Sequence, residues 1–388
     1  MSAANPLTVL LALKDRAPFT FRWMAYANDV GFPFKVLIAD GGADESVPRM
    51  LADRSHFPNV DYDYVRYPYD ATYSDYYAKM ADALGRVRTP YVVLADNDDL
   101  FVVEGLKKSV EFLSANPDYV ACGGQWAIFW VASSAGEKAP DRVYGTNVEW
   151  KFTTSAHTEI STNARQRLRR QALGGDDNFY HVRRTPELHR QFDLVKRLDA
   201  KDLFLFGQVV SYLCAIGGKI EQLDTLYLAR QHNSPGSSGG AHQEKYGGWW
   251  GRMLVPTWSA DFARFVDITS AELAAVDGIS LDEARDWVVK TYRLAVAPLL
   301  LADVLEEQSV TPAMPLAVQL VRALVRLPEE SWLKRSIRKW YRKSRWLSFD
   351  AVNATQFLAT PAPNTRSQLA PIREFLQRGQ SITFTSGT

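Results

Sequence analysis

Short apolar runs alternate with amphipathic stretches along the first part of the chain. The runs at 7–13, 34–39 and 91–95 are apolar at nearly every position, as expected for strands that are buried on both faces. The stretches at 18–30 and 74–86 instead carry apolar residues at helical spacing. Strands that alternate with helices predict an α/β fold, in which a mainly parallel sheet is covered by helices.

The pattern changes in the second half of the chain. Residues 133–178 are rich in Gly, Ser, Thr and Arg, which predicts a variable loop region. A helical pattern returns at 203–216 and a strand pattern at 219–228. The segment 233–251 is rich in Gly, Ser and His and predicts a mobile loop. From 258 to 327, Ala, Leu and Val recur at helical spacing, which predicts a C-terminal helical region.

These changes divide the 388 residues into four segments. We expect an α/β domain over 1–232, a flexible loop or lid over 233–257, a helical accessory region over 258–350 and a C-terminal tail over 351–388. At roughly 150 residues per domain, two or three structural units are expected.

A basic helix is predicted near the end of the accessory region. Residues 332–347 contain seven Lys or Arg and no acid. Their apolar and aromatic residues fall on one helical face, opposite most of the charge: Leu333, Ile337, Trp340, Tyr341 and Leu347. This pattern is typical of a helix that lies on an anionic membrane surface. A helix that docks on the protein with its basic face in solvent explains the same spacing, so both interpretations stay open.

Charge and cysteine content exclude several classes of protein. A formal net charge of +1 argues against a general nucleic-acid binder. Cys122 and Cys214 are the only cysteines, so neither a disulfide framework nor a CxxC zinc site is available. No signal peptide and no apolar stretch of about 18 residues is recognisable. We expect a cytoplasmic protein, held peripherally at the inner face of the plasma membrane if 332–347 binds lipid.

An acidic cluster follows the strand at 91–95, where the sequence reads Asp96, Asn97, Asp98 and Asp99. Carboxylates this close together repel one another unless a cation or a hydrogen-bond network compensates them. Oxygen ligands of this kind suit Mg²⁺ or Mn²⁺, which would act as a Lewis acid on a departing diphosphate. The alternative is an acidic turn in which Asp98 or Asp99 caps the next helix.

Two common phosphate-binding folds are excluded by the glycine pattern. The segment LALKDRAPF, between the first strand and helix, has no glycine, so the dinucleotide-binding fingerprint is absent. The chain also lacks a GxxxxGK[ST] motif, which excludes a P-loop.

Three strand ends together resemble a known family. LTVLLALKDR, VLIADGG and YVVLADNDD agree in order and spacing over 7–119 with the family-2-like glycosyltransferases of bacterial polysaccharide and lipopolysaccharide biosynthesis, which have a GT-A fold. The resemblance implies that Asp40 contacts the nucleotide base, that Asp96 lies near the ribose and that Asp98 binds the metal. Asp40 can also be read as a turn residue before two glycines. The implied donor-binding residues are Arg16, Asp40, Asp96, Asn97 and Arg230, and the implied metal ligands are Asp96, Asp98 and His232.

The stretch LDAKDLFLFGQVVSYLCAIGGKIEQLD resembles the acceptor-side block of the same family. There a carboxylate ahead of a helix deprotonates the incoming hydroxyl. Asp202 is the candidate base, Asp199 is its reserve, and Asp177, beside Asp176, is a rival. The sequence departs from the family because the usual acidic pair is not intact, with Gln208 at a place where a carboxylate would also fit. Asp202 can also be read as a plain helix N-cap.

Basic and aromatic residues follow the last predicted strand of the α/β domain. Related enzymes often place a basic residue or a histidine here, on a loop that closes over the diphosphate. Arg230 is suited to neutralise phosphate charge, and His232 is a candidate third metal ligand or an ordinary surface histidine. The segment with His242, Trp249 and Trp250 suits an active-site lid.

The sequence therefore predicts a metal-dependent, inverting glycosyltransferase that uses Mn²⁺ or Mg²⁺. The expected donor is a nucleotide sugar, and the expected acceptor is a hydroxyl of a glycan or lipid-linked glycan. A nucleic-acid partner is not expected. Two alternatives stay open: a nucleotidyltransferase, and a non-catalytic membrane-associated scaffold whose sugar-nucleotide site has decayed.

Overall fold

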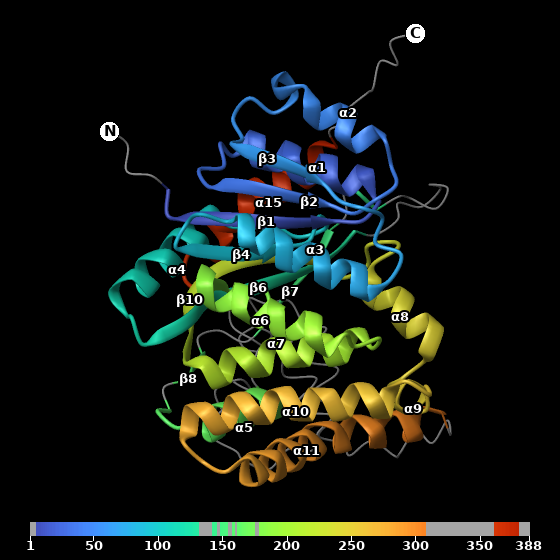
Figure 1. Ribbon diagram of the computed structural model, residues 1–388. Coiled ribbons are helices and arrows are strands. Elements are labelled where there is room, and N and C mark those ends of the chain that lie inside the picture. The colour runs from blue at the N-terminus through green and yellow to red at the C-terminus, as the bar shows by residue number, and fades with distance from the viewer. Residues whose placement is uncertain are drawn as a thin grey trace, which may run out of the picture.

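A computed structural model describes most of the chain: residues 5–131, 142–145, 148–153, 157–159, 161–174, 178–307 and 361–379. Asp176, Asp177 and the basic helix predicted at 332–347 lie outside the described residues. The described strands form a ten-stranded sheet with the order β3-β2-β1-β4-β9-β6-β10-β5, in which β7 also pairs with β6 and β8 with β10. Helices cover both faces of this sheet (Figure 1).

The first half of the sheet follows the alternation that the sequence predicts. Its elements are β1 (Leu7–Leu13), α1 (Ala17–Asp29), β2 (Lys35–Asp40), α2 (Ser46–Ala52), η1 (Arg54–His56), β3 (Tyr62–Arg66), α3 (Tyr73–Arg86) and β4 (Tyr91–Ala95). The strands β3, β2, β1 and β4 are neighbours and all pair in parallel. Their carboxyl ends therefore lie along one edge of the sheet, where ligands bind in open α/β sheets.

The second half of the sheet is mixed. Its elements are β5 (Leu100–Phe101), α4 (Val103–Ala115), β6 (Tyr119–Val131), β7 (Val148–Phe152), β8 (His157–Glu159), α5 (Ala164–Gly174), β9 (Val182–Arg184), α6 (Thr185–Leu198), α7 (Leu203–Gly217) and β10 (Lys219–Gln231). The long strands β6 and β10 pair in parallel, while the shorter β5, β7, β8 and β9 join in antiparallel orientation. The sheet is thus mainly parallel and covered by helices, which confirms the predicted fold class.

Burial on both faces explains why the strands are apolar at successive positions. In β1, successive side chains alternate between the faces: Val9 and Leu11 belong to the core on one face, whereas Leu10 belongs to the core on the other. Val9 and Leu11 share their core with Trp23 of α1, and Leu10 shares its core with Met80 of α3. All five side chains are at most 1% exposed, so the α/β sheet has a core on each side.

The helices after the sheet form a further layer. They are α8 (Ser238–Tyr246), α9 (Trp249–Met253), α10 (Trp258–Asp277) and α11 (Leu281–Glu307). In Figure 1, α6 and α7 lie between the sheet and the pair α10 and α11. C-terminal helices were expected from residue 258 onward. Of the helices that the structure describes, none is both long and apolar enough to cross a bilayer.

The last described helix, α15 (Thr365–Arg378), packs against the α/β domain. The rings of Phe375 and Tyr26 meet edge to face with centroids 5.5 Å apart. Arg378 forms an ion pair with Asp29 at 2.7 Å, and the N–H of Gly145 donates to the carbonyl of Leu376 at 3.1 Å. Part of the segment that was expected to be a tail therefore contributes to the same core as β1.

Candidate active site

An acidic turn at the end of β4 brings three carboxylates together. Asp96, Asp98 and Asp99 each offer an oxygen, and these atoms lie within 4.8 Å of one another. Within the described part of the chain, this is the one group of three or more His, Cys, Asp or Glu side chains whose ligand atoms lie close enough together to bind a single metal ion. Asp98 is 7% exposed and Asp99 is 2% exposed, so solvent screens their charges only weakly.

Two side chains from distant parts of the chain stabilise the charge of Asp98. The Arg16 guanidinium donates from Nη2 to Oδ2 at 3.0 Å, and the Ser234 hydroxyl donates to the same oxygen. Burial by itself raises the pKa of Asp98, but the charge of Arg16 and the hydrogen bond from Ser234 outweigh it, so the net pKa lies below the usual carboxyl value. Asp98 is therefore ionised at neutral pH.

Asp96 and Asp99 are less well compensated than Asp98. The pKa of Asp96 is raised by burial and by the charge of Asp98, although the Tyr180 hydroxyl donates to its Oδ2. Burial also raises the pKa of Asp99 well above its usual value. The protein's own groups thus neutralise the cluster only in part. An all-oxygen, three-carboxylate donor set of this kind fits a hard divalent cation such as Mn²⁺ or Mg²⁺.

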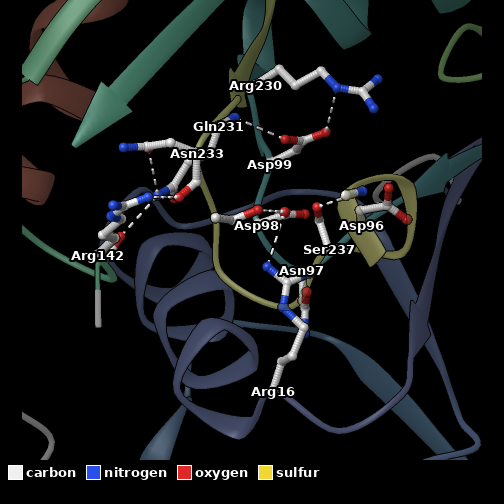
Figure 2. Close-up of polar contacts among 12 residues, drawn as sticks. Arg16, Asp96, Asn97, Asp98, Asp99, Arg142, Arg230, Gln231, Asn233 and Ser237 are labelled. Carbon is white, nitrogen blue, oxygen red and sulfur yellow. Dashed lines mark hydrogen bonds and ion pairs between the residues drawn. The ribbon is translucent and has the colours of Figure 1, made fainter. Parts of the chain in front are cut away.

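Asp99 connects the acidic turn to β10. Its Oδ1 accepts from the Gln231 N–H at 3.0 Å, and its Oδ2 lies 3.8 Å from Nε of Arg230. Figure 2 shows Arg230 and Gln231 meeting Asp99, while Arg16 approaches the turn from the opposite side. The Arg230 guanidinium also lies over the ring of Tyr180, 4.6 Å from its centroid. The site is therefore flanked by the Arg230 guanidinium from β10 and by the Arg16 guanidinium from the turn between β1 and α1.

A strained turn after β1 aims Arg16 at the acidic cluster. Asp15 and Arg16 have φ values of 55° and 60°, in the left-handed region that non-glycine residues rarely adopt. Such residues cost on the order of 1–2 kcal/mol each, and they tend to cluster at functional sites. The turn places the Arg16 guanidinium against Asp98.

A fully buried arginine stabilises the acidic turn at the end of β4. Arg22 of α1 is 0% exposed and donates to the carbonyl of Asp98 at 2.6 Å and to Oε1 of Gln231 at 2.7 Å. The Asn97 side chain donates to Thr20 of the same helix at 3.1 Å. In this structure Asn97 therefore attaches the acidic turn to α1, and its proposed contact with the donor stays a prediction.

Asp40 lies at the end of β2 in a second polar network. Its Oδ2 accepts from the Tyr64 hydroxyl at 2.6 Å and from Nη1 of Arg66 at 2.9 Å. Its Oδ1 accepts from the N–H of Gly42 at 2.8 Å, as in the turn that the sequence also allowed. Asp40 is 2% exposed and its carboxylate is held in one orientation by these contacts.

His232 lies just beyond β10 and packs against an aromatic ring. Its imidazole is tilted against Trp130, with ring centroids 5.0 Å apart. Burial, together with the charges of Arg230 and Lys151, lowers the pKa of His232, which favours the neutral, metal-binding form. The group of three carboxylates does not include His232. Its role as a third ligand stays a prediction.

Asp202 is the N-cap of α7, as one reading of the sequence proposed. Its Oδ1 accepts from the N–H of Leu205 at 2.7 Å. The sequence did not reveal that its other oxygen, Oδ2, lies 3.1 Å from Nε2 of His242 in α8. The reserve base Asp199 lies at the end of α6, pairs with Lys201 at 2.7 Å and is 43% exposed at its side chain. Asp202 is thus the more enclosed of the two.

Comparisons with known proteins give structural matches of low sequence identity. Neither a family model nor a curated protein matches the chain. The crystal structure of S. aureus TarS 1–349 in complex with UDP-GlcNAc is 14% identical, with a TM-score of 0.45, over 94% of this chain and 92% of that one. The complex of the same protein with UDP is 12% identical, with a TM-score of 0.44, over the same shares of the two chains. These identities are too low to assign a role to any residue of this chain.

Proposed function

We propose that the protein is a GT-A-like, family-2-like glycosyltransferase that moves a sugar from a nucleotide-sugar donor to an acceptor hydroxyl. The observation that supports this most strongly is the group of Asp96, Asp98 and Asp99 at the carboxyl edge of a parallel sheet, flanked by Arg16 and Arg230. Partly neutralised carboxylates beside cationic side chains suit a metal-bound diphosphate. The order of the strand-end motifs in the sequence supports the same function.

Asp96 and Asp98, with Asp99 beside them, would hold Mn²⁺ or Mg²⁺. A bound divalent cation supplies Lewis-acid stabilisation of a departing nucleoside diphosphate. Arg16 and Arg230 present guanidinium groups on opposite sides of the acidic turn, and guanidinium groups bind phosphate oxygens bidentately. Asp40, which the neighbouring network holds in place, is proposed to accept hydrogen bonds from the nucleotide base.

Asp202 is proposed as the general base for an inverting transfer. Burial by itself raises its pKa, but the hydrogen bond from His242, the charge of Arg252 and the Leu205 N–H lower the net pKa below the usual value. Asp202 is thus ionised at neutral pH. It takes the proton of the acceptor hydroxyl, whose oxygen bonds to the anomeric carbon as the bond from that carbon to the diphosphate breaks. Asp199 and Asp177 remain the alternative bases.

The cellular setting is proposed on the sequence alone. The acceptor is a glycan or lipid-linked glycan in cell-surface polysaccharide or lipopolysaccharide assembly, and the reaction takes place at the cytoplasmic face of the plasma membrane. The basic residues at 332–347 would hold the enzyme to anionic lipid, at about 1 kcal/mol for each Lys or Arg near the surface.

A panel of nucleotide sugars tests the proposed function. UDP-, GDP-, CDP- and dTDP-linked sugars are each added with and without Mn²⁺, and the Tm is measured, because a ligand that binds the folded state raises it by mass action. We expect one nucleotide class to raise the Tm, and to do so more strongly with Mn²⁺. If no nucleotide sugar changes the Tm while a nucleoside triphosphate does and releases diphosphate, a nucleotidyltransferase is indicated instead.

A further inference from the structure

His242 makes a buried contact with the proposed base that helix capping does not require. The N-cap contact uses Oδ1 of Asp202, whereas Nε2 of His242 lies 3.1 Å from Oδ2. His242 is 3% exposed and comes from α8, 40 residues further along the chain. A cap residue needs one oxygen for the N–H groups of its helix. The second oxygen is therefore held by a residue that has no part in capping α7.

The other ring nitrogen of His242 is also held. Nδ1 lies 3.3 Å from the hydroxyl of Tyr73 in α3. The Nε2–H tautomer satisfies both contacts, because Nε2 then donates to Asp202 while Nδ1 accepts from Tyr73. The imidazole is further enclosed by the rings of Phe204 and Tyr246, with centroid distances of 5.6 Å and 4.7 Å. These contacts leave the imidazole little freedom to turn.

Arg252 places a cationic group near the other oxygen of the carboxylate. Its Nη1 lies 3.8 Å from Oδ1 of Asp202, and its guanidinium lies over the rings of Phe204 and Trp249 at 4.2 Å and 3.9 Å. Helices α8 and α9 thus both reach the proposed base. A carboxylate offers about four lone-pair sites, so the hydrogen bonds from Leu205 and His242 leave it able to accept a proton.

We propose that His242 is a positioning residue for Asp202, orienting the carboxylate toward the acceptor hydroxyl and stabilising its charge, while Tyr73 fixes the tautomer of the imidazole. The proposal rests on the proposed function, in which Asp202 is the general base. It assigns to α8 a part in catalysis, in a segment that was expected from the sequence to form a lid. The tyrosine, histidine and aspartate come from three separate helical elements, which the fold brings into one hydrogen-bonded chain.

The pH dependence of turnover separates positioning from a merely structural role. Among the described residues, the charged and titratable groups that contact His242 or line the same pocket are Asp202 at the start of α7, Tyr73 of α3, Tyr246 of α8, Arg252 of α9, Asp261 of α10 and Lys201. The hydrogen bond from His242 lowers the pKa of Asp202, and the base is active only when it is ionised. Loss of that hydrogen bond therefore moves the acid limb of the pH profile to higher pH.

The test measures hydrolysis of the stabilising nucleotide sugar, with Mn²⁺ and with water as acceptor, across a pH series. We expect His242→Ala to lower kcat about 10- to 100-fold, as for a misplaced catalytic group, with little change in KM for the donor. Its acid limb should move to higher pH. His242→Gln, which keeps an N–H donor, should restore part of kcat, and Tyr73→Phe should lie between wild type and His242→Ala. His189→Ala, on α6, is the matched control.

The outcomes separate this inference from the proposed function. If His242→Ala has the kcat and the acid limb of the wild type, the inference is overturned. A rise in kcat would also overturn it, because it would show that His242 blocks access to the base. If His242→Ala does not fold, wild-type profiles in both His242→Gln and Tyr73→Phe overturn it. Absence of turnover by the wild-type protein with every nucleotide sugar would remove the proposed function, and with it the base role of Asp202.

Discussion

The pKa of Asp98 is shifted in the opposite direction from the pKa values of its acidic neighbours Asp96 and Asp99. Arg16 and Ser234 keep its pKa low, whereas burial raises the pKa of Asp96 and of Asp99. Without a cation, protons are therefore retained by the less compensated carboxylates above the ordinary carboxyl range. A metal ion binds the deprotonated groups, so metal binding and proton release are coupled at this turn.

This coupling predicts a pH-dependent effect of Mn²⁺ on stability. The raised pKa values mean that Asp96 and Asp99 lose their protons only above the ordinary carboxyl value of about 4, so Mn²⁺ competes with fewer protons as the pH rises. We expect the increase in Tm caused by Mn²⁺ to grow between about pH 5 and about pH 8. An equal increase at every pH in that range would show that these carboxylates do not bind the metal.

At the residue scale, the residues that lie at strand ends could be predicted from the sequence. Asp40 and Asp98 could be named because each closely follows an apolar run, and parallel strands end at the same edge of the sheet. Their partners could not be found in this way. Ser234 lies 136 residues from Asp98, and Tyr180 lies 84 residues from Asp96. Contacts over such separations depend on how the second half of the sheet assembles.

The turns that follow β1 and β2 pack against each other closely enough to require a glycine. A Cβ at Gly42 would lie 2.5 Å from the backbone N of Asp15 and 3.0 Å from Oδ1 of Asp40. The first of these atoms is backbone and belongs to the strained turn that aims Arg16. The shape of one turn therefore depends on the absence of a side chain in the other.

Gly42→Ala should destabilise this edge of the sheet. We expect the free energy of unfolding to fall by about 1–3 kcal/mol, as for an overpacked site, and donor binding to weaken because Asp15, Arg16 and Asp40 are displaced. Denaturant unfolding and donor titration measure the two effects. Gly207→Ala in α7 is the control, because nothing lies within 4 Å of its added Cβ. Equal stability of the two variants would contradict the close packing of the turns.

At the scale of elements, segments with a clear apolar pattern were predicted closely, and segments without one were not. The structure has β4 at Tyr91–Ala95 and α3 at Tyr73–Arg86, close to the ranges expected from the sequence. The Gly- and Ser-rich segment after β10, expected to be a loop, contains α8 and α9. Helices this short are marginal without tertiary contacts, and here His242 and Arg252 supply them. The amino-acid composition of the segment does not show which tertiary contacts it will make.

At the scale of the whole molecule, the end of the described chain stabilises its beginning. Phe375 of α15 is 0% exposed and lies in the core that contains β1 and α1. From the sequence, this helix was expected to belong to a C-terminal tail over 351–388. Its short amphipathic pattern did not show which surface it would cover, because that surface is formed by residues far away in the sequence. The two residues of the ion pair between Arg378 and Asp29, for example, are 349 positions apart.

Phe375→Ala should therefore destabilise the α/β domain. We expect the free energy of unfolding to fall by about 3–5 kcal/mol, because the substitution removes a buried aromatic ring and leaves a cavity. Leu254→Ala is the control, since its side chain is 77% exposed, and we expect a change within about 0.5 kcal/mol. Denaturant unfolding measures both. If the free energy of unfolding falls no more in Phe375→Ala than in the control, α15 is not part of the core.

Release of nucleoside diphosphate from a nucleotide sugar tests the central claim most directly. The measurement compares the wild-type protein, Asp98→Asn and Asp63→Asn, each with Mn²⁺ and with a chelator. Asp63 is the control because its side chain is 54% exposed and pairs with Lys35, away from the acidic turn. We predict metal-dependent release by the wild type and the control, and a loss on the order of 10² to 10³ in Asp98→Asn. Release that needs no divalent metal, or that Asp98→Asn leaves unchanged, would contradict the account.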